Sequence, residues 1–294
     1  MLYLLLSSFL FGLSYPLASL LVKDADPLSF AFHFLLTTAI IQIPFVLYKS
    51  REVRKFTFTQ WRLLAIYGII GSFLYWVEFS SLKVGLPIAH LTFIFLTVPA
   101  WTNLSEYLRG RGQGWNLNKW MLAMVGTAIL LYPENRVFSF LHLLPILTAI
   151  LMALFLTYSK RCQDSGISSL HCSFFNDVFS VIGVLVFIML QGREVPPPMP
   201  DNLMNIGLYA VLIGLLPVLL LLKGLKTTDL RKASTIFMAE PALTGILSIL
   251  IGNQAISAPF GMGAALILLA NLPDETLEYS KRISLPYVTG LFRG

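Results

Sequence analysis

Residues 232–252 read KASTIFMAEPALTGILSILIG, an apolar run with one carboxylate, Glu240, directly before Pro241. The run has the length of about 20 residues that an α-helix needs to cross the hydrocarbon core of a bilayer. Proline removes a backbone hydrogen bond from a helix and can leave a carbonyl group open to a ligand. The stretch therefore predicts a membrane-spanning helix that is interrupted beside an acidic side chain.

The composition of the whole chain also indicates that the protein lies in a lipid bilayer. Of its 294 residues, 56% are hydrophobic and only 12% are charged, and the mean hydropathy is +0.75. An ordinary soluble domain has about 25% charged residues, and a single hydrophobic core stops growing near this chain length. Lipid must therefore surround most of the chain, which predicts an all-α polytopic membrane protein.

Apolar stretches of spanning length recur about ten times along the chain, separated by short polar joints. The expected spans are 2–22, 28–48, 62–82, 86–106, 119–133, 139–159, 168–190, 204–222, 232–252 and 257–272. The first stretch has no basic segment before it and is longer than the apolar core of a signal peptide, so we interpret it as a span.

The basic residues separate by side when the N-terminus is placed in the cytoplasm. Only four of the 21 Lys and Arg residues then fall in outer joints, namely Lys23, Lys83, Arg136 and Arg193, and the other 17 fall in inner joints. Cytoplasmic loops of membrane proteins carry this excess of positive charge. A missed helix would reverse every later joint, so about ten spans and cytoplasmic N- and C-termini support each other. The same bias explains the net charge of +6 without nucleic acid as a partner.

The two halves of the chain resemble each other. Residues 120–133 (WMLAMVGTAILLYP) and 260–273 (FGMGAALILLANLP) each follow a helix with an internal proline, Pro99 in the first half and Pro241 in the second. Five spans per half is an odd number, so the halves must have opposite orientations. Inverted repeats with interrupted helices are typical of alternating-access carriers, whose substrate site lies at the repeat interface.

These features resemble the drug/metabolite transporter superfamily, and specifically its EamA-like branch of paired five-helix repeats. Residues 235–243 (TIFMAEPAL) are similar to the family's Leu-Glu-Pro-Val helix. Gly126 and Gly263 match its glycine-rich last helix in each repeat, and residues 143–150 (LLPILTAI) match the opening of its second repeat.

The resemblance implies a first repeat over residues 1–136, a second over 137–272 and a cytoplasmic tail over 273–294. The chain departs from the family where Val98 precedes Pro99. The acidic residue beside the proline is therefore present in one half only.

Ionisable residues inside the expected spans include the acidic Glu78, Asp177 and Glu240 and the histidines His33, His90 and His171. Charged groups inside a bilayer are costly, so such residues are candidates for function. No Lys or Arg falls well inside a span, whereas a carrier of phosphorylated solutes would need one to match phosphate. Carboxylates alone favour a cationic or zwitterionic substrate, or a proton that alternates with it.

Helix rise gives the depth of these residues. Asp177 and Glu240 each fall about nine residues from the inner end of their spans, which predicts a pair near the midplane. Glu78, His33 and His90 fall nearer the outer surface, where they would form a proton relay if they faced one another. The structural alternatives are a carboxyl bonded to a neighbouring helix, a pairing of Glu78 with a rim lysine, and histidines that only pack.

Three aromatic residues within the spans are further candidates: Tyr75, Trp76 and Trp101. Beside a carboxylate, such rings can hold a cation through cation–π attraction. The alternative for each ring is ordinary packing.

The leading hypothesis is an alternating-access transporter, not an enzyme. It would move a small cationic or zwitterionic metabolite, such as an amino acid, an amine or an S-adenosylmethionine-like solute, by exchange or proton antiport through a central cavity between the repeats. One alternative is an intramembrane lipid-modifying enzyme, although the chain has neither His-Glu-x-x-His nor Gly-x-Ser-x-Gly. The other is a lipid-handling membrane protein, which would not need three buried carboxylates.

We expect no cofactor and no metal ion. The expected partners are a small-molecule substrate, protons as a coupling ion and the lipid bilayer, and the expected assembly is a monomer or a homodimer. Compact loops and the lack of a transit peptide favour a bacterial inner membrane.

Overall fold

The computed structural model describes residues 1–14, 17–18, 26–83, 88–108, 117–131, 140–194, 203–252 and 257–271. Within these ranges every regular element is a helix. The expected boundary at residue 136 and the expected tail over 273–294 lie outside the described residues.

Helices of the first half are α1 (Leu2–Phe11), α3 (Pro27–Tyr48), α4 (Ser50–Val53), α5 (Phe58–Ser81), α6 (Ile88–Phe95), α7 (Val98–Leu108) and α8 (Leu117–Leu131). Those of the second half are η1 (Phe140–Leu143), α9 (Leu144–Asp164), α10 (Ser169–Leu190), α11 (Leu203–Tyr209), the π-helical segment η3 (Ala210–Leu215), α12 (Leu216–Leu225), α13 (Leu230–Phe237), α14 (Ala239–Gly252) and α15 (Ala258–Ala270).

Five helical stretches in the described residues are long and apolar enough to cross a membrane. They are Pro27–Tyr48, Phe58–Ser81, Phe140–Asp164, Ser169–Leu190 and Met204–Leu225. Large apolar side chains on several of them are exposed, for example Phe45 on α3, Ile69 on α5 and Val186 on α10. Exposed apolar surface on this scale needs an apolar solvent, so the chain is a multi-pass integral membrane protein.

The starts of the long helices are fixed by local sequence. The Asp26 carboxylate accepts a hydrogen bond from the backbone N–H of Ser29 (3.0 Å) at the start of α3. Thr57 and Gln60 form a reciprocal capping box at the start of α5. These contacts satisfy N–H groups that the first turn of a helix leaves without a partner.

Two of the expected spans are divided by a turn just before their proline. The first consists of α6 and α7, with Pro99 in the first turn of α7, and the second of α13 and α14, with Pro241 in the first turn of α14. The first turn tolerates proline because its N–H groups have no partner within the helix. Each proline therefore begins a new helix instead of kinking a continuous one.

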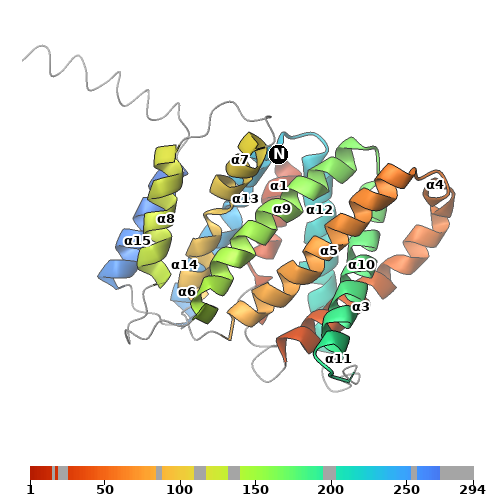
Figure 1. The fold of residues 1–294 in the computed structure, drawn as a ribbon, viewed down its shortest axis with the longest axis horizontal. Helices are drawn as coiled ribbons and strands as arrows, with labels where there is room; N and C mark the ends of the chain where they lie inside the picture. Colours follow the sequence, from red (N-terminus) through yellow and green to blue (C-terminus); the bar gives the residue numbers. More distant parts are fainter. Residues whose placement is uncertain are drawn as a thin grey trace, which may run out of the picture.

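Contacts at the helix ends show that α3 and its counterpart α10 run in opposite directions. Gln60, at the start of α5, donates a hydrogen bond to the carbonyl oxygen of Ser165 (2.9 Å), directly after α9. At the opposite edge, Arg193 after α10 bonds Asp26 before α3, with 3.1 Å between Nη1 and Oδ1. α3 therefore begins at the edge where its counterpart α10 ends, as inverted halves require (Figure 1).

The helix pairings also repeat with the halves exchanged. α5 packs on α9, and α1 packs on α12. The broken helices pack on each other, α6 against α14 and α7 against α13. α8 and α15, the last helices of the halves, pair at one end of the molecule, while α3, α10 and α11 lie toward the other (Figure 1).

Glycines allow the last helices to cross closely. A Cβ atom on Gly126 would lie 2.7 Å from the carbonyl oxygen of Gly263, and one on Gly263 would lie 2.8 Å from that of Gly126. Small residues let the backbones of membrane helices approach in this way. The glycines singled out in the sequence therefore have a packing role.

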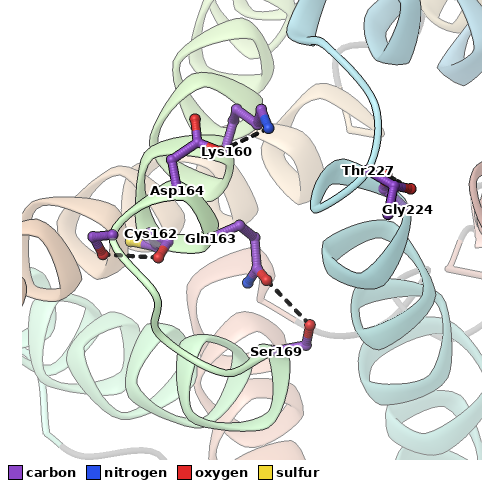
Figure 2. A network of polar contacts seen from close by, with 8 residues as sticks. Lys160, Cys162, Gln163, Asp164, Ser169, Gly224 and Thr227 are labelled. Atoms are coloured by element: carbon purple, nitrogen blue, oxygen red, sulfur yellow. Dashed lines mark hydrogen bonds and ion pairs between the residues drawn. The ribbon is translucent and has the colours of Figure 1, made fainter.

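The turn between α9 and α10 is held by polar contacts of its own (Figure 2). Lys160 and Asp164 form an ion pair one helical turn apart, with 2.7 Å between Nζ and Oδ1. Ser169 donates to the amide oxygen of Gln163 (3.3 Å). Both chain cysteines, Cys162 and Cys172, are buried and free near this turn.

Candidate functional site

A small cavity lies where helices of both halves meet. Its lining comes from α1, α3 and α5 of the first half and from α9, α11, η3, α12, α13 and α14 of the second. Its volume is about 20 Å³, which holds a water molecule but no organic solute. The described lining residues are Phe11, Ser14, Phe34, Leu74, Tyr75, Glu78, Phe79, Met152, Phe155, Tyr209, Ile213, Leu221, Phe237 and Glu240.

The carboxylate of Glu240 reaches this cavity from the broken helix. Glu240 is in the first turn of α14, directly after the turn at Met238. Its side chain is 3% exposed, and its Oε2 atom has no hydrogen-bond partner among the described residues. The N-terminal end of a helix favours negative charge. The break therefore places an unbonded acidic oxygen in an apolar interior.

The second carboxylate of the cavity belongs to Glu78, near the end of α5. It is partly buried and lines the same cavity as Glu240. The two acidic residues come from different halves of the chain. No Lys, Arg or His is among the described residues that line the cavity.

Aromatic rings make up half of the lining. Phe34 contacts Tyr75 at 5.5 Å, Phe79 at 5.9 Å and Tyr209 at 5.3 Å between ring centroids. Phe11 and Phe237 form a separate edge-to-face pair at 5.6 Å. Carboxylates among aromatic faces make a surface that attracts organic cations.

Asp177, which we expected to pair with Glu240, lies in different surroundings. One carboxylate oxygen accepts from Gln42 Nε2 (2.7 Å) and the other from Asn176 Nδ2 (3.2 Å). All three side chains are buried where α10 packs against α3, and none is among the described lining of the cavity. Depth along the membrane normal does not say which way a side chain points around its helix. The helices are rotated so that Glu78, and not Asp177, lines the cavity with Glu240.

The structure does not bring the two expected histidines to the cavity lining that it describes. His90 Nδ1 lies 2.9 Å from the carbonyl oxygen of Leu130, and its ring stacks on Phe260 at 5.1 Å. These partners belong to α8 and α15. His33 is buried on α3, with its ring against that of Phe32. Relay roles for both histidines stay predictions.

The expected tryptophans also lie apart from the described lining, whereas Tyr75 is part of it. Trp76 packs on Phe187 of α10 at 5.5 Å. Trp101 donates its indole N–H to the hydroxyl group of Thr97 (3.2 Å) and contacts Trp120 at 5.8 Å. Trp101 therefore closes the turn between α6 and α7.

The break beside Pro99 is occupied by a side chain. Asn271, directly after α15, donates from Nδ2 to the carbonyl oxygens of Leu96 and Ile267, both at 2.8 Å. Leu96 lies in the turn that divides α6 from α7. In the first-half break, the carbonyl oxygen of Leu96 is thus hydrogen-bonded by a side chain of the protein. The second-half break instead borders the cavity.

Several lining residues were not singled out from the sequence, notably Phe11, Ser14, Tyr209 and Phe237. Phe237 had a signal, because it lies only three residues before Glu240. Tyr209 directly precedes the π-helical segment η3, a feature common at functional sites that sequence does not reveal. Among the described residues, no group of three or more His, Cys, Asp or Glu residues could hold a metal ion.

Comparison with known proteins gives three likenesses. A profile of the EamA-like transporter family matches residues 1–132 and again residues 139–272. An uncharacterized transporter of Clostridium kluyveri is 28% identical over 130 residues, which are 43% of this chain and 41% of that protein. This match therefore spans less than half of the relative's length.

The third likeness is to a protein of known crystal structure. The two folds agree with a TM-score of 0.64 over 96% of this chain and 98% of the other, at 18% sequence identity. At that identity the likeness shows the fold alone.

Proposed function

Because this chain belongs to the EamA-like transporter family, we propose that it carries a small organic cation across a membrane by alternating access. Family membership supports a membrane transporter and confirms the resemblance that the sequence predicted. The carried solute and the way it moves are the proposal.

The observation that carries the proposal is the cavity with Glu78 and Glu240. It combines two carboxylates from different halves with seven aromatic rings, and its described lining has no basic residue. An ammonium or onium group gains charge pairing and cation–π attraction there. A zwitterion would also need a partner for its own carboxylate, so we now favour the cationic class over the zwitterionic one.

The architecture supports alternating access. We propose ten spans with cytoplasmic ends, residues 1–136 and 137–272 as inverted repeats and 273–294 as a tail. The reciprocal helix pairings and the antiparallel α3 and α10 agree with this arrangement. The cavity has no room for a solute, so the helices around it must separate toward one side at a time. Carriers with interrupted helices work by such rocking of one repeat against the other.

Exchange or proton antiport would follow from charge balance. Two nearby carboxylates in an apolar interior are costly unless a cation or a proton neutralises them. A substrate cation that leaves must therefore be replaced by another cation or by protons. A bacterial inner membrane and a monomer or homodimer complete the proposal.

Uptake into proteoliposomes tests it directly. We expect labelled amines or quaternary ammonium ions to exchange, with zwitterionic amino acids transported less well. Glu240→Gln should reduce transport at least about 100-fold, since a buried charge pair contributes roughly 2–5 kcal/mol. Glu194→Gln, an exposed glutamate between α10 and α11, is the matched control. Full activity of Glu240→Gln, or no movement of any cation, would contradict the proposal.

A further inference from the structure

We propose that the substrate is an organic dication, a diamine whose two ammonium groups are joined by an aliphatic chain. The inference rests on the proposed function, because it concerns the same cavity and specifies which cation fits it. What carries it is the presence of two carboxylates, each with aromatic rings of its own cluster nearby, in a lining whose other side chains are mostly apolar.

The surroundings of Glu240 are formed by Phe237 and Phe11. Phe237 ends α13, three residues before Glu240 and across the turn at Met238, and makes an edge-to-face pair with Phe11 at 5.6 Å. Thr244, one turn after Glu240, donates to the carbonyl oxygen of Gly12 (2.8 Å), which ties α14 to the end of α1 next to Phe11. An ammonium group at Glu240 would therefore meet a carboxylate and two aromatic rings.

The surroundings of Glu78 are formed by a different set of rings. Tyr75 and Phe79 flank it on α5, and both contact Phe34. These three rings belong to one buried hydrophobic cluster. The rings beside Glu240 belong to another. The cavity thus joins two clusters, and each supplies one carboxylate with its own aromatic partners.

The remaining apolar side chains of the lining are Leu74, Met152, Phe155, Ile213 and Leu221, four of them aliphatic. They offer contact to methylene groups and no hydrogen bond to a polar one. A diamine has the same pattern, because two charged ends are joined by an apolar chain. The hydroxyl groups of Ser14 and Tyr209 are the only other polar side-chain groups besides Tyr75 in the described lining.

Charge balance favours two positive groups over one. A single ammonium group would neutralise one carboxylate and leave the other in an apolar interior, which is costly unless a proton binds there. A diamine neutralises both at once. A monoamine that binds together with a proton is the competing occupant, and the experiment below separates the two.

The test is a competition binding assay on the purified full-length protein, with 1,4-diaminobutane and 1,5-diaminopentane against butylamine and pentylamine. Diols of the same length serve as neutral controls at equal ionic strength. We expect the better diamine to bind at least about tenfold more tightly than its monoamine, the gain expected from a second charge-assisted contact.

Two variants assign the effect to the two carboxylates. Glu78→Gln and Glu240→Gln should each remove the preference for the diamine, because diamine affinity falls about tenfold more than monoamine affinity. Glu194→Gln should keep the preference. Size-exclusion profiles confirm folding. If a variant does not fold, the wild-type chain-length series still decides, because two fixed carboxylates predict one optimal diamine length.

The outcomes separate this inference from the proposed function. Equal affinity for diamines and monoamines in the wild type, or no optimal length, would overturn the inference and leave an organic-cation carrier standing. Equal loss of both amines in each single variant would do the same. If no amine of either kind bound, both proposals would fail.

Discussion

Asp177 and Glu240 are two acidic residues expected at similar depth, yet their surroundings differ. Both carboxylate oxygens of Asp177 accept amide hydrogen bonds, from Gln42 at 2.7 Å and Asn176 at 3.2 Å. Glu240 has an Oε2 atom without a partner among the described residues, and it borders a cavity. A buried polar group is costly unless it is hydrogen-bonded. Asp177 is thus satisfied by the fold, whereas Glu240 keeps an oxygen without a partner at the cavity, where we propose that a solute binds.

The difference lies in their hydrogen-bond partners and not in their depth, and on our proposal it separates a structural carboxylate from a binding one. The two groups should therefore respond differently to substitution. Changes around Asp177 should lower the stability of the folded protein, and changes at Glu240 should mainly alter binding. The following predictions test that separation, in order of expected effect on stability.

The largest effect is expected for Asp177→Ala. The substitution removes the acceptor of Asn176 Nδ2 and one acceptor of Gln42 Nε2, and it opens space between α3 and α10. We expect a loss of about 2–4 kcal/mol in the free energy of unfolding, measured by titration with SDS in mixed micelles. Glu240→Ala should change that free energy by less than about 1 kcal/mol. Equal losses in the two variants would remove the distinction.

The next effect concerns Gly71 on α5, which faces the neighbours of Asp177. A Cβ atom there would lie 2.5 Å from Ser180 Oγ and 2.8 Å from Asn176 Oδ1. Gly71→Ala should therefore destabilise the protein by about 1–3 kcal/mol through overpacking, by the same SDS titration. Gly261→Ala is the matched control, because no atom lies within 4 Å of its added Cβ. An unchanged Gly71→Ala variant would show that this interface is loose.

A smaller effect is expected for Tyr209→Phe in the cavity. The hydroxyl group donates only a long hydrogen bond to the carbonyl oxygen of Ser14 (3.5 Å), and the ring packing stays. We expect a stability change below about 1 kcal/mol. A larger loss of stability in the SDS titration would mean that the cavity lining, like the surroundings of Asp177, helps to hold the fold.

The smallest effect is expected at the edge of the molecule. Lys160 and Asp164 form an ion pair whose Asp164 side chain is 58% exposed. Such pairs one turn apart contribute about 0.3–0.5 kcal/mol. Asp164→Asn should lower the unfolding free energy by no more than that, and the loss should disappear at high salt. A salt-independent loss above 1 kcal/mol would contradict this account.

Much of the fold could be predicted from apolar periodicity. The run that contains Glu240 and Pro241 predicts an interrupted helix, and the structure has the turn at Met238. Gly126 and Gly263 predict a glycine-rich last helix in each half, and both lie at the crossing of α8 and α15. These features depend on residues that are close together in the sequence, so they can be predicted from one sequence.

The site could be predicted only in part. Proline and acidic residues are rare within spans, so Glu78 and Glu240 stand out. Tyr209 and Phe11 do not, because 13% of the chain is aromatic. The partner of each carboxylate depends on the rotation of its helix about its axis. Residue type and depth do not determine that rotation. The sequence alone therefore could not predict that Asp177 and Glu240 have different surroundings.

One measurement tests the central claim most directly: the affinity of the purified protein for its best amine ligand, compared among wild type, Glu240→Gln and Asp177→Asn. Asparagine keeps one acceptor oxygen, so Asp177→Asn should remain folded. The account predicts a loss of at least about 100-fold for Glu240→Gln and a change below about threefold for Asp177→Asn. Unchanged binding by Glu240→Gln, with binding lost in a folded Asp177→Asn variant, would contradict it.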